Sequence, residues 1–321
     1  MVALPDLPDP NLVAADAALV AGQVRRTRPY LGMSAIGAEC ARQLWYGFRW
    51  VSLADFDALT LKRFADGHAT EAVVVARLKA VDTLELHDVD DRGQQFGFED
   101  LGGHLKGHMD GVVLGLAQAP TTWHVLEIKA TAEKKLAELR KAVRDKGEKH
   151  ALRAWNPVYY AQAVLYMHYA GLDRHYLVAS TPGGRDWFAL RTDADPAEAQ
   201  RLIKRAESII TSDSPPPRIA GPDFYMCRWC DRSAICHEGE PADRNCRTCL
   251  HATAQLDGGW TCARWQGLDL DLETQATGCP HHLFLPGLVP GDQIDATQDS
   301  VTYKMPDGST WVDGRAPDAA S

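Results

Sequence analysis

The stretch GHMDGVVLGLAQAPTTWHVLEIKAT at residues 107–131 decides the fold, because it reads as two neighbouring β-strands joined by the turn AQAPTT. Alternate side chains of a strand point to the same face, so Glu127 and Lys129 share one face while Ile128 faces the core. An adjacent strand that ends at Asp110 brings a second carboxylate beside Glu127. Two carboxylates favour Mg²⁺ or Mn²⁺, which keep several water ligands when bound. The stretch therefore predicts a divalent metal centre.

The spacing of these three charged residues is also compatible with a salt-bridged hairpin on the surface. Against that alternative, the sequence LEIK places the charges beside apolar strand residues, where an unpaired charge is costly. Glu71 lies on an otherwise apolar helix face, and Gln162 and Tyr166 lie one turn apart on another predicted helix. A metal-bound water in such a centre is a nucleophile, and the cation stabilises charge on a phosphate. Lys129 is expected to orient that water or to neutralise the phosphate.

These residues occur in the order seen in the PD-(D/E)XK nuclease superfamily, and the chain resembles in particular its RecB-like and phage-exonuclease branches. The resemblance covers roughly residues 30–236. It implies an α/β fold with a restriction-endonuclease-like central mixed sheet flanked by helices. It also implies a metal held by Asp110, Glu127 and the backbone carbonyl of Ile128. The residues to which it gives catalytic roles are Glu71, Asp110, Glu127, Lys129, Gln162 and Tyr166.

Glu71 marks a departure from many RecB-like members, which carry a histidine four residues after a glycine. The fourth residue after Gly67 is Glu71, and a glutamate at this position resembles the phage-exonuclease branch. Glu71 is therefore predicted as a third metal ligand, with His68, one turn away, in reserve. The alternative for His68 is a hydrogen-bonded, partly buried side chain without a metal.

Periodicity and capping residues predict the helices around this centre. A helix is expected at 34–50 with Ser34 as its N-cap, and a longer one at 58–80. The buried stripe of the longer helix is expected to comprise Leu61, Phe64, His68, Glu71, Val75 and Leu78. The other predicted elements are a basic helical segment at 133–155 that is mobile near Gly147, a helix at 156–172 between Asn156 and Gly171, strands at 174–180 and 186–192, and a helix at 195–211.

Three closely spaced cysteines, Cys227, Cys230 and Cys236, follow the predicted catalytic residues, and Cys40 precedes them. In a chain without a secretory signal, such thiols favour metal binding over disulfides. The layout of one cysteine before and three after resembles the iron–sulfur nucleases of the AddB type and of CRISPR adaptation. That resemblance implies a [4Fe–4S] cluster held by Cys40, Cys227, Cys230 and Cys236 in a structural role. Zinc is the alternative.

A second set of four cysteines forms the pattern C-x2-C-x12-C-x16-C, followed by Pro-His-His. The set predicts a tetrahedral Zn²⁺ site, in which His281 or His282 could replace one thiolate. Its members are Cys246, Cys249, Cys262 and Cys279. A second iron–sulfur cluster and four unrelated reduced cysteines are the alternatives.

The charge of the chain bears on its partners. The net charge of −9 on 321 residues argues against extensive, sequence-independent coating of DNA. The segment 133–155 is nevertheless basic, and we predict phosphate contacts at Lys134, Lys135, Arg140 and Lys141; a solvated helix face is the alternative. The chain has no run of 18 apolar residues and no basic, apolar leader, so we expect no membrane span and a cytoplasmic location.

Together these patterns predict a metal-dependent deoxyribonuclease, specifically an exonuclease that acts from DNA ends in phage-type recombination or repair. The predicted domains are an N-terminal arm with one short helix at 1–30, a nuclease domain at 31–239 closed by the first cysteine set, and a cysteine-rich metal-binding module at 240–321 that ends in a hairpin around Asp307–Gly308. The expected partners are linear DNA ends and a recombinase or single-strand-annealing protein; the oligomeric state is not predicted. The rival functions are a structure-specific or CRISPR-adaptation-type endonuclease, a catalytically idle DNA-end-binding subunit, and a metal-stapled interaction module.

Overall fold

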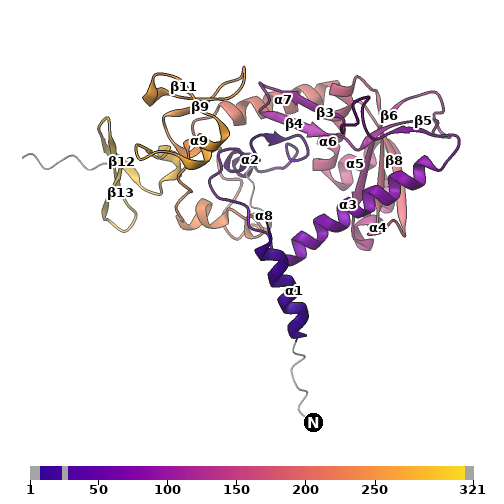
Figure 1. Cartoon of the computed structure of the whole chain (residues 1–321), viewed down its shortest axis with the longest axis horizontal. Coiled ribbons are helices and arrows are strands. Elements are labelled where there is room, and N and C mark those ends of the chain that lie inside the picture. The colour runs from indigo at the N-terminus through magenta and orange to yellow at the C-terminus, as the bar shows by residue number, and fades with distance from the viewer. Residues whose placement is uncertain (1–7, 24–27, 315–321) are drawn as a thin grey trace, which may run out of the picture.

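The computed structural model describes residues 8–23 and 28–314 (Figure 1). The predicted arm contains one helix, α1 (Pro10–Ala21), which is capped by the carboxylate of Asp9. It packs on the long helix α3 (Ala58–Lys79) and forms an ion pair with it between Asp16 and Lys62. The rest of the arm (1–7 and 24–27) and the end of the predicted C-terminal module (315–321) lie outside the described residues.

The main sheet is five-stranded and mixed, with the strand order β2-β5-β6-β7-β8. Only β6 and β7 run parallel; the other three pairs are antiparallel. The antiparallel pair β5 and β6 is the one predicted from residues 107–131, with Gly111 opposite Leu126. The strands are β2 (Glu85–His87), β5 (Gly111–Leu114), β6 (His124–Ala130), β7 (Arg174–Ser180) and β8 (Trp187–Asp193). The predicted mixed α/β architecture is thereby confirmed.

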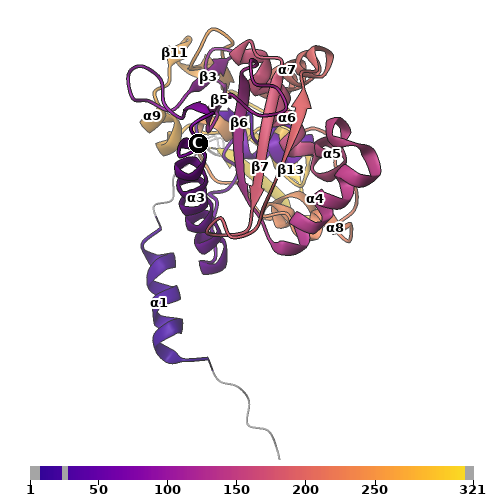
Figure 2. The same cartoon turned by 90° about the vertical axis from the view of Figure 1, so that its right-hand side faces the viewer.

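Helices cover both faces of this sheet, as Figure 2 shows. On one face, Val74 and Val75 of α3 pack against Leu126 and Ile128 of β6. On the other face, residues of β6 and β7 such as Val125 join a core with α6 (Pro157–Ala170) and α7 (Pro196–Thr211). Because successive side chains of β6 alternate between these faces, Glu127 and Lys129 point to the α6 side.

Helix α3 is longer than the sheet that it covers. Its first half runs past the sheet toward α1 (Figure 1), so Phe64 is 47% exposed and His68 is exposed. Only Thr70, Val74 and Val75 of this helix are buried. The predicted buried stripe is therefore wrong for Phe64 and His68, because no strand lies beneath the first half of the helix.

The helix predicted at 34–50 is shorter in the structure and begins later than Ser34. Helix α2 spans only Ala41–Phe48, with Cys40 at its N-cap position. The preceding residues form β1 (Leu31–Gly32) and a turn, and β1 pairs with β4 (Leu105–His108), which also pairs with β3 (Gly97–Asp100). A Cβ atom at Gly37 would come within 2.7 Å of the Cβ of Ala161, so the chain packs directly on α6 here. These tertiary contacts override the local helix signal at Ser34.

Parallel strands need a long crossover connection, and three helices connect β6 to β7. They are α4 (Glu133–Lys146), α5 (Glu148–Trp155) and α6. Gly147, with φ of 77°, separates α4 from α5. The side chain of Asn156 accepts hydrogen bonds from two amides at the start of α6, and Gly171 ends that helix with φ of 64°. The predicted caps of α6 are confirmed.

Short elements and two small sheets make up the chain after α7. The sheets have the orders β11-β10-β9 and β12-β13-β14. The predicted hairpin around Asp307–Gly308 is confirmed as the turn between β13 and β14. The elements are α8 (Tyr225–Arg228), η1 (Ala234–Glu238), η2 (Cys246–Thr248), β9 (Ala252–Ala254), β10 (Trp260–Cys262), η3 (Ala263–Trp265), β11 (Leu268–Asp269), α9 (Leu272–Thr277), η4 (Pro286–Leu288), β12 (Asp292–Ala296), β13 (Ser300–Lys304) and β14 (Thr310–Gly314).

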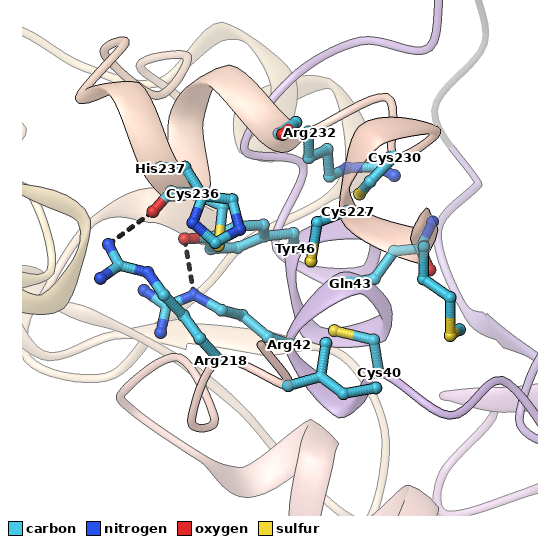
Figure 3. A pocket seen from close by; sticks show the side chains of 13 residues that line it. Cys40, Arg42, Gln43, Tyr46, Arg218, Cys227, Cys230, Arg232, Cys236 and His237 are labelled. Atoms are coloured by element: carbon cyan, nitrogen blue, oxygen red, sulfur yellow. Dashed lines mark hydrogen bonds between the residues drawn. The ribbon is translucent and has the colours of Figure 1, made fainter. Parts of the chain in front are cut away.

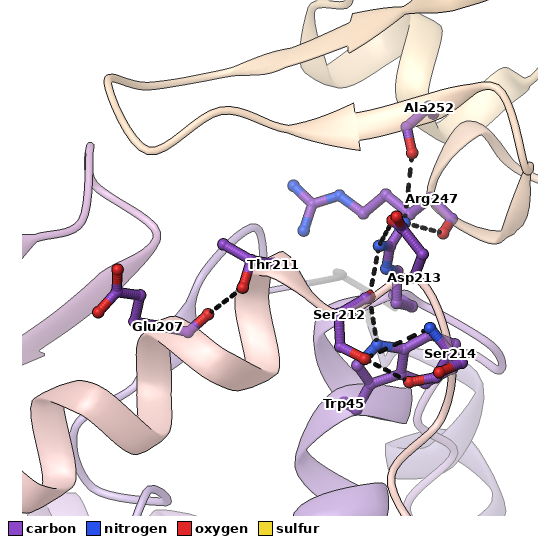
Figure 4. Close-up of polar contacts among 9 residues, drawn as sticks. Trp45, Glu207, Thr211, Ser212, Asp213, Ser214, Arg247 and Ala252 are labelled. Atoms are coloured by element: carbon purple, nitrogen blue, oxygen red, sulfur yellow. Dashed lines mark hydrogen bonds and ion pairs between the residues drawn. The ribbon is translucent and has the colours of Figure 1, made fainter.

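This C-terminal region shares one hydrophobic core with the sheet domain. Trp260 is 1% exposed, and its ring centroid lies 5.4 Å from that of Phe48 in α2. Figure 4 shows the polar side of the junction, where Ser212, Arg247 and Ala252 come together near Trp45 of α2. The indole nitrogen of Trp45 donates to the carbonyl oxygen of Ser212 at 2.9 Å. Within residues 8–23 and 28–314, no helix is both long and apolar enough to cross a membrane.

Candidate functional site

Asp110 lies between β4 and β5 rather than at the end of a strand. Its Oδ2 accepts a 2.7 Å hydrogen bond from the backbone amide of Ile128. This bond ties the start of β5 to β6 and holds the carboxylate beside Glu127, the residue before Ile128. The two predicted carboxylates are thus brought together.

Glu127 points into the protein and is 3% exposed. Its Oε1 accepts hydrogen bonds from Lys129 Nζ and, at 2.8 Å, from Gln162 Nε2. Gln162 Nε2 also lies 3.2 Å from the hydroxyl oxygen of Tyr166, one turn further along α6. Glu127 Oε2 is buried and has no hydrogen-bond partner among the described residues. Of the predicted pair, Gln162 therefore contacts Glu127 directly and Tyr166 contacts Gln162. Oε2 of Glu127 stays free of hydrogen bonds from the described residues.

The electrostatics of this group follow from burial and crowding. Burial, and then the charge of Glu127, raises the pKa of Asp110 well above its usual value. Burial also raises the pKa of Glu127, although Lys129 opposes the shift. Burial acts to lower the pKa of Lys129, but Glu127 and Asp110 outweigh it and raise that pKa. Glu71 adds negative charge that both carboxylates feel. Asp110 and Glu127 thus share the ammonium group of Lys129, while Glu71 adds a third negative charge, and this excess of negative charge fits a bound cation.

An open pocket reaches two of these three carboxylates. Glu71 of α3 and Asp110 line it together, and the exposed His68 lies at the same pocket. Three residues that the sequence reasoning missed also line it: Lys79, Asp88 and Gln95. Lys79 Nζ pairs with Asp88 Oδ1 at 2.7 Å, and Gln95 Nε2 donates to the carbonyl oxygen of Met109 at 3.2 Å. The loop between β2 and β3 carries no motif that would have marked Asp88 or Gln95 in advance.

In the described part of the chain, no three His, Cys, Asp or Glu side chains are placed ready to hold a metal ion. Metal binding by Asp110, Glu127, Glu71 and the Ile128 carbonyl therefore stays a proposal. The donor set still suits a hard cation, because it consists of carboxylate oxygens and includes the unpartnered Oε2 of Glu127.

The basic helix α4 follows β6, as predicted, but two of its four candidate DNA contacts form ion pairs within the protein. Arg140 forms a two-pronged ion pair with Asp186, with N–O distances of 2.9 and 2.5 Å. Lys135 pairs with Glu138 on the same helix at 2.9 Å. Lys134 and Lys141 are exposed. The latter two are the better candidates for phosphate contacts.

The first cysteine set lines a single pocket, although its members lie far apart in the sequence (Figure 3). Cys40 comes from the start of α2, and Cys227, Cys230 and Cys236 come from α8, the turn after it and η1. All eight cysteines of the chain are free thiols. Arg42, Arg218 and Arg232 also line the pocket, and Arg42 donates to the hydroxyl of Tyr46 at 2.9 Å. Four thiols beside three arginines suit an anionic thiolate-bound centre.

The second cysteine set also lines one pocket: Cys246, Cys249, Cys262 and Cys279. Of the two predicted substitute ligands, His282 is occupied at both ring nitrogens, which lie 3.1 Å from Thr248 Oγ1 and 3.2 Å from Arg244 Nη1. His281 stands edge-on to Trp265, with ring centroids 5.6 Å apart. The sequence reasoning missed His251, which lines the same pocket and has a buried Nε2 without a partner in the described ranges.

Comparisons with known proteins leave the family open. No protein-family model matches the chain, and no curated protein matches it. Solved structures that are similar include SSO0001, at 16% identity and a TM-score of 0.36, with 70% of this chain and 94% of that one covered. The alkaline exonuclease LHK-Exo from Laribacter hongkongensis is 15% identical with a TM-score of 0.40, and 60% of this chain and 90% of that one are covered. The same enzyme in complex with dAMP matches at 15% identity and a TM-score of 0.39, covering 60% and 88%. At these values, membership of the PD-(D/E)XK superfamily stays a prediction.

Proposed function

We propose that this protein is a divalent-metal-dependent deoxyribonuclease with a restriction-endonuclease-like catalytic domain at residues 31–239. The observation that carries the proposal is the environment of Glu127. One of its carboxylate oxygens is fixed by Lys129 and Gln162, while the other is buried and unpartnered beside Asp110. A purely structural ion pair would leave no reason to bury that second oxygen without a partner.

Asp110, Glu127 and Glu71 would hold Mg²⁺ or Mn²⁺, with the carbonyl oxygen of Ile128 as a further ligand. A cation bound there supplies an activated water and stabilises the negative charge that develops on the scissile phosphate. Gln162 acts on Glu127: by holding Oε1 at 2.8 Å, it leaves Oε2 for the cation. Tyr166 in turn lies 3.2 Å from Gln162 and limits the orientations open to its amide.

The ammonium group of Lys129 would contact the scissile phosphate of the DNA directly. Its ammonium group pairs with Glu127 and lies 5.2 Å from the centre of the Tyr159 ring. The neighbouring carboxylates raise its pKa, so it stays charged at neutral pH. A fixed cation at this position neutralises phosphate charge and holds a water for attack.

The proposed substrate is DNA, taken up at a linear end. Lys134 and Lys141 lie on α4, which begins three residues after β6 ends, so they are close in sequence to the catalytic strand. The net charge of −9 restricts DNA contact to such local basic groups. The cytoplasm and a recombinase or single-strand-annealing partner belong to the same proposal of phage-type recombination or repair.

The first cysteine set would hold a [4Fe–4S] cluster in this proposal, with zinc as the alternative. Its four thiols come from both ends of the catalytic domain and line one pocket (Figure 3). A centre bound by Cys40, Cys227, Cys230 and Cys236 would tie α2 to α8 and η1, and so close the domain. Its role would be structural.

The test uses the purified full chain with Mg²⁺ and end-labelled linear DNA beside covalently closed circles. The wild-type protein should degrade linear DNA and spare the circles, and chelation should stop it. Asp110→Asn and Glu127→Gln should each lower the rate by about 10²- to 10³-fold, as expected for loss of electrostatic stabilisation. Asp91→Asn, an exposed carboxylate in the loop between β2 and β3, is the matched control. Full activity of Asp110→Asn contradicts the assigned centre, and rapid cleavage of closed circles favours an endonuclease.

A further inference from the structure

The second cysteine set lies in a region that has little regular structure of its own. Cys246 begins η2, Cys249 follows it, Cys262 ends β10, and Cys279 comes after α9. Cys246, Cys249 and Cys262 are buried, at 8%, 6% and 8% exposure. Three separate short elements thus deliver four free thiols to one pocket. Small, loop-rich regions of this kind usually need a metal or disulfides for stability.

The four thiols lie close to one another and to backbone groups of neighbouring loops. Burial raises the pKa of Cys249, and the backbone amides of His251 and Leu283, which are hydrogen-bonded to its sulfur, oppose that shift. The other members of the set are close enough to Cys246 to interact with it electrostatically. The thiol of Cys246 donates to the carbonyl oxygen of Thr274 at 3.3 Å. Zinc would take the place of that proton.

Between the first two cysteines lies Arg247, which is 1% exposed and joins this region to the catalytic domain. It donates from Nη1 to the carbonyl oxygen of Phe48 at 2.9 Å and from Nη2 to that of Pro29 at 3.0 Å. Its guanidinium group also lies 3.7 Å from the centre of the Trp50 ring. These partners surround the end of α2, so Arg247 fixes the position of that helix.

An arginine at the end of α2 also donates hydrogen bonds back to the C-terminal region. Arg49, the residue after α2, donates from Nη1 to the carbonyl oxygens of Arg247 and Ala252, each at 3.3 Å. From Nη2 it donates to the carbonyl oxygen of Ser212 at 2.8 Å. Among residues 8–23 and 28–314, the side chain of Arg247 donates to neutral acceptors: two carbonyl groups and, at 2.8 Å, Oε1 of Gln275. A guanidinium buried among neutral acceptors is costly, and the position of its backbone decides whether those hydrogen bonds form.

We propose that Cys246, Cys249, Cys262 and Cys279 bind a structural Zn²⁺ ion that holds Arg247 against the end of α2. Four thiolates in a closed tetrahedral set are the common form of a structural zinc site. The Cys246–Cys249 turn carries Arg247, so a metal on both cysteines restrains its backbone from either side. Because metal binding free energy becomes folding free energy, the ion would stabilise the junction and not the C-terminal region alone. This role is independent of DNA cleavage.

The first test measures metal content. Full-length protein purified without exposure to air should contain one zinc ion per chain that Cys262→Ser loses. Cys230→Ser, which alters the first cysteine set, is the matched control and should keep that zinc. If Cys262→Ser does not fold, removing zinc from the wild-type chain with a chelator and adding it back gives the same information. Equal zinc in the wild type and Cys262→Ser, or iron in place of this zinc, overturns the proposal.

The second test measures the link to α2. Arg247→Met keeps the apolar bulk but removes the donors; it should retain zinc and unfold at a lower temperature. Chelation should lower the unfolding temperature of the wild type by more than that of Arg247→Met, because the ion acts partly through Arg247. An equal loss on chelation in both proteins would show that zinc and Arg247 act separately, and would overturn the link.

Discussion

Gln162 donates a 2.8 Å hydrogen bond to Oε1 of Glu127, and this contact joins helix α6 to strand β6. The amide oxygen of Gln162 is buried and without a partner among the described residues, as is Oε2 of Glu127. We therefore propose that Gln162 is a positioning residue, which orients the carboxylate of Glu127. The contribution of Gln162 can be measured as a change in the Mg²⁺ requirement, since Glu127 is a proposed metal ligand.

Gln162→Leu should lower cleavage by about 10- to 100-fold and raise the Mg²⁺ concentration needed for half-maximal rate, the effect typical of lost contacts behind a metal ligand. Thermal unfolding checks that the fold is intact. Tyr166→Phe removes only a 3.2 Å neighbour of Gln162 and should have a much smaller effect. An unchanged Mg²⁺ requirement in Gln162→Leu would mean that Glu127 needs no such support.

Lys129→Met should reduce turnover without raising the Mg²⁺ requirement, because Lys129 acts on phosphate and water and is not a metal ligand. The variant should also unfold more easily without metal, since Asp110 and Glu127 then lose the positive charge of Lys129. Adding Mg²⁺ should recover stability in the variant more than in the wild type. Calorimetry with and without Mg²⁺ measures this difference, and its absence contradicts a cation site at these carboxylates.

Lys134→Glu with Lys141→Glu should weaken DNA binding and make it less dependent on salt. Each lost phosphate contact reduces the slope of log K against log salt by about 0.9. Arg140→Ala should have little effect on the slope, because Arg140 is already paired with Asp186. Lys204→Glu, an exposed lysine on α7, is the control. If the slope of log K against log salt in the double variant equals that of the wild type, α4 does not contact DNA and is only a solvent-exposed helix.

Protein purified without air should be brown if the first cysteine set binds a [4Fe–4S] cluster. Cys40→Ser should bleach the colour and lower the unfolding temperature, because Cys40 brings α2 to the pocket. Cys249→Ser belongs to the second set and should leave the colour unchanged. Iron and sulfide analysis measures the cluster directly; two zinc ions and no iron in the wild type would instead favour zinc at both sets.

Acid should destabilise the protein through His175. This histidine is 1% exposed on β7, and burial lowers its pKa to about 3. An unfolded histidine has a pKa of about 6.5, so between these values only the unfolded chain binds the proton. Stability is therefore complete above about pH 6.5 and falls below it by ~1.4 kcal/mol per pH unit from this one group. His175→Leu should flatten the slope of unfolding free energy between pH 6 and 4 by that amount, with His150→Leu as the exposed control; an unchanged slope contradicts the assignment.

Local signals predicted the elements that depend on local contacts. The pairing of β5 with β6 followed from alternation, and the ends of α6 followed from Asn156 and Gly171. Gln162 and Glu127 could be linked because their order along the chain resembles a known superfamily. In each case, the determining residues lie within one element or one hairpin, or match a known motif.

Features that depend on contacts between residues far apart in the sequence were not predicted correctly. Helix α2 starts at Ala41 because the residues before it pair with β4 and pack on α6. Arg140 finds its partner 46 residues away in Asp186, so its charge alone made it look available for DNA. Arg247 offered no local signal, since its carbonyl partners lie about two hundred residues earlier. Contacts of this range can be recognised only once the fold is known.

The separation between Arg49 and its acceptors has a consequence for biosynthesis. The carbonyl groups of Arg247 and Ala252 follow Arg49 by 198 and 203 residues, so α2 leaves the ribosome long before the residues that fix its end. Such distant contacts slow folding, because the intervening chain must first be ordered. Until Arg247 has been made, Phe48 and Trp50 lack a main packing partner and stay open to wrong associations. A nascent chain halted before residue 247 should therefore depend on chaperones.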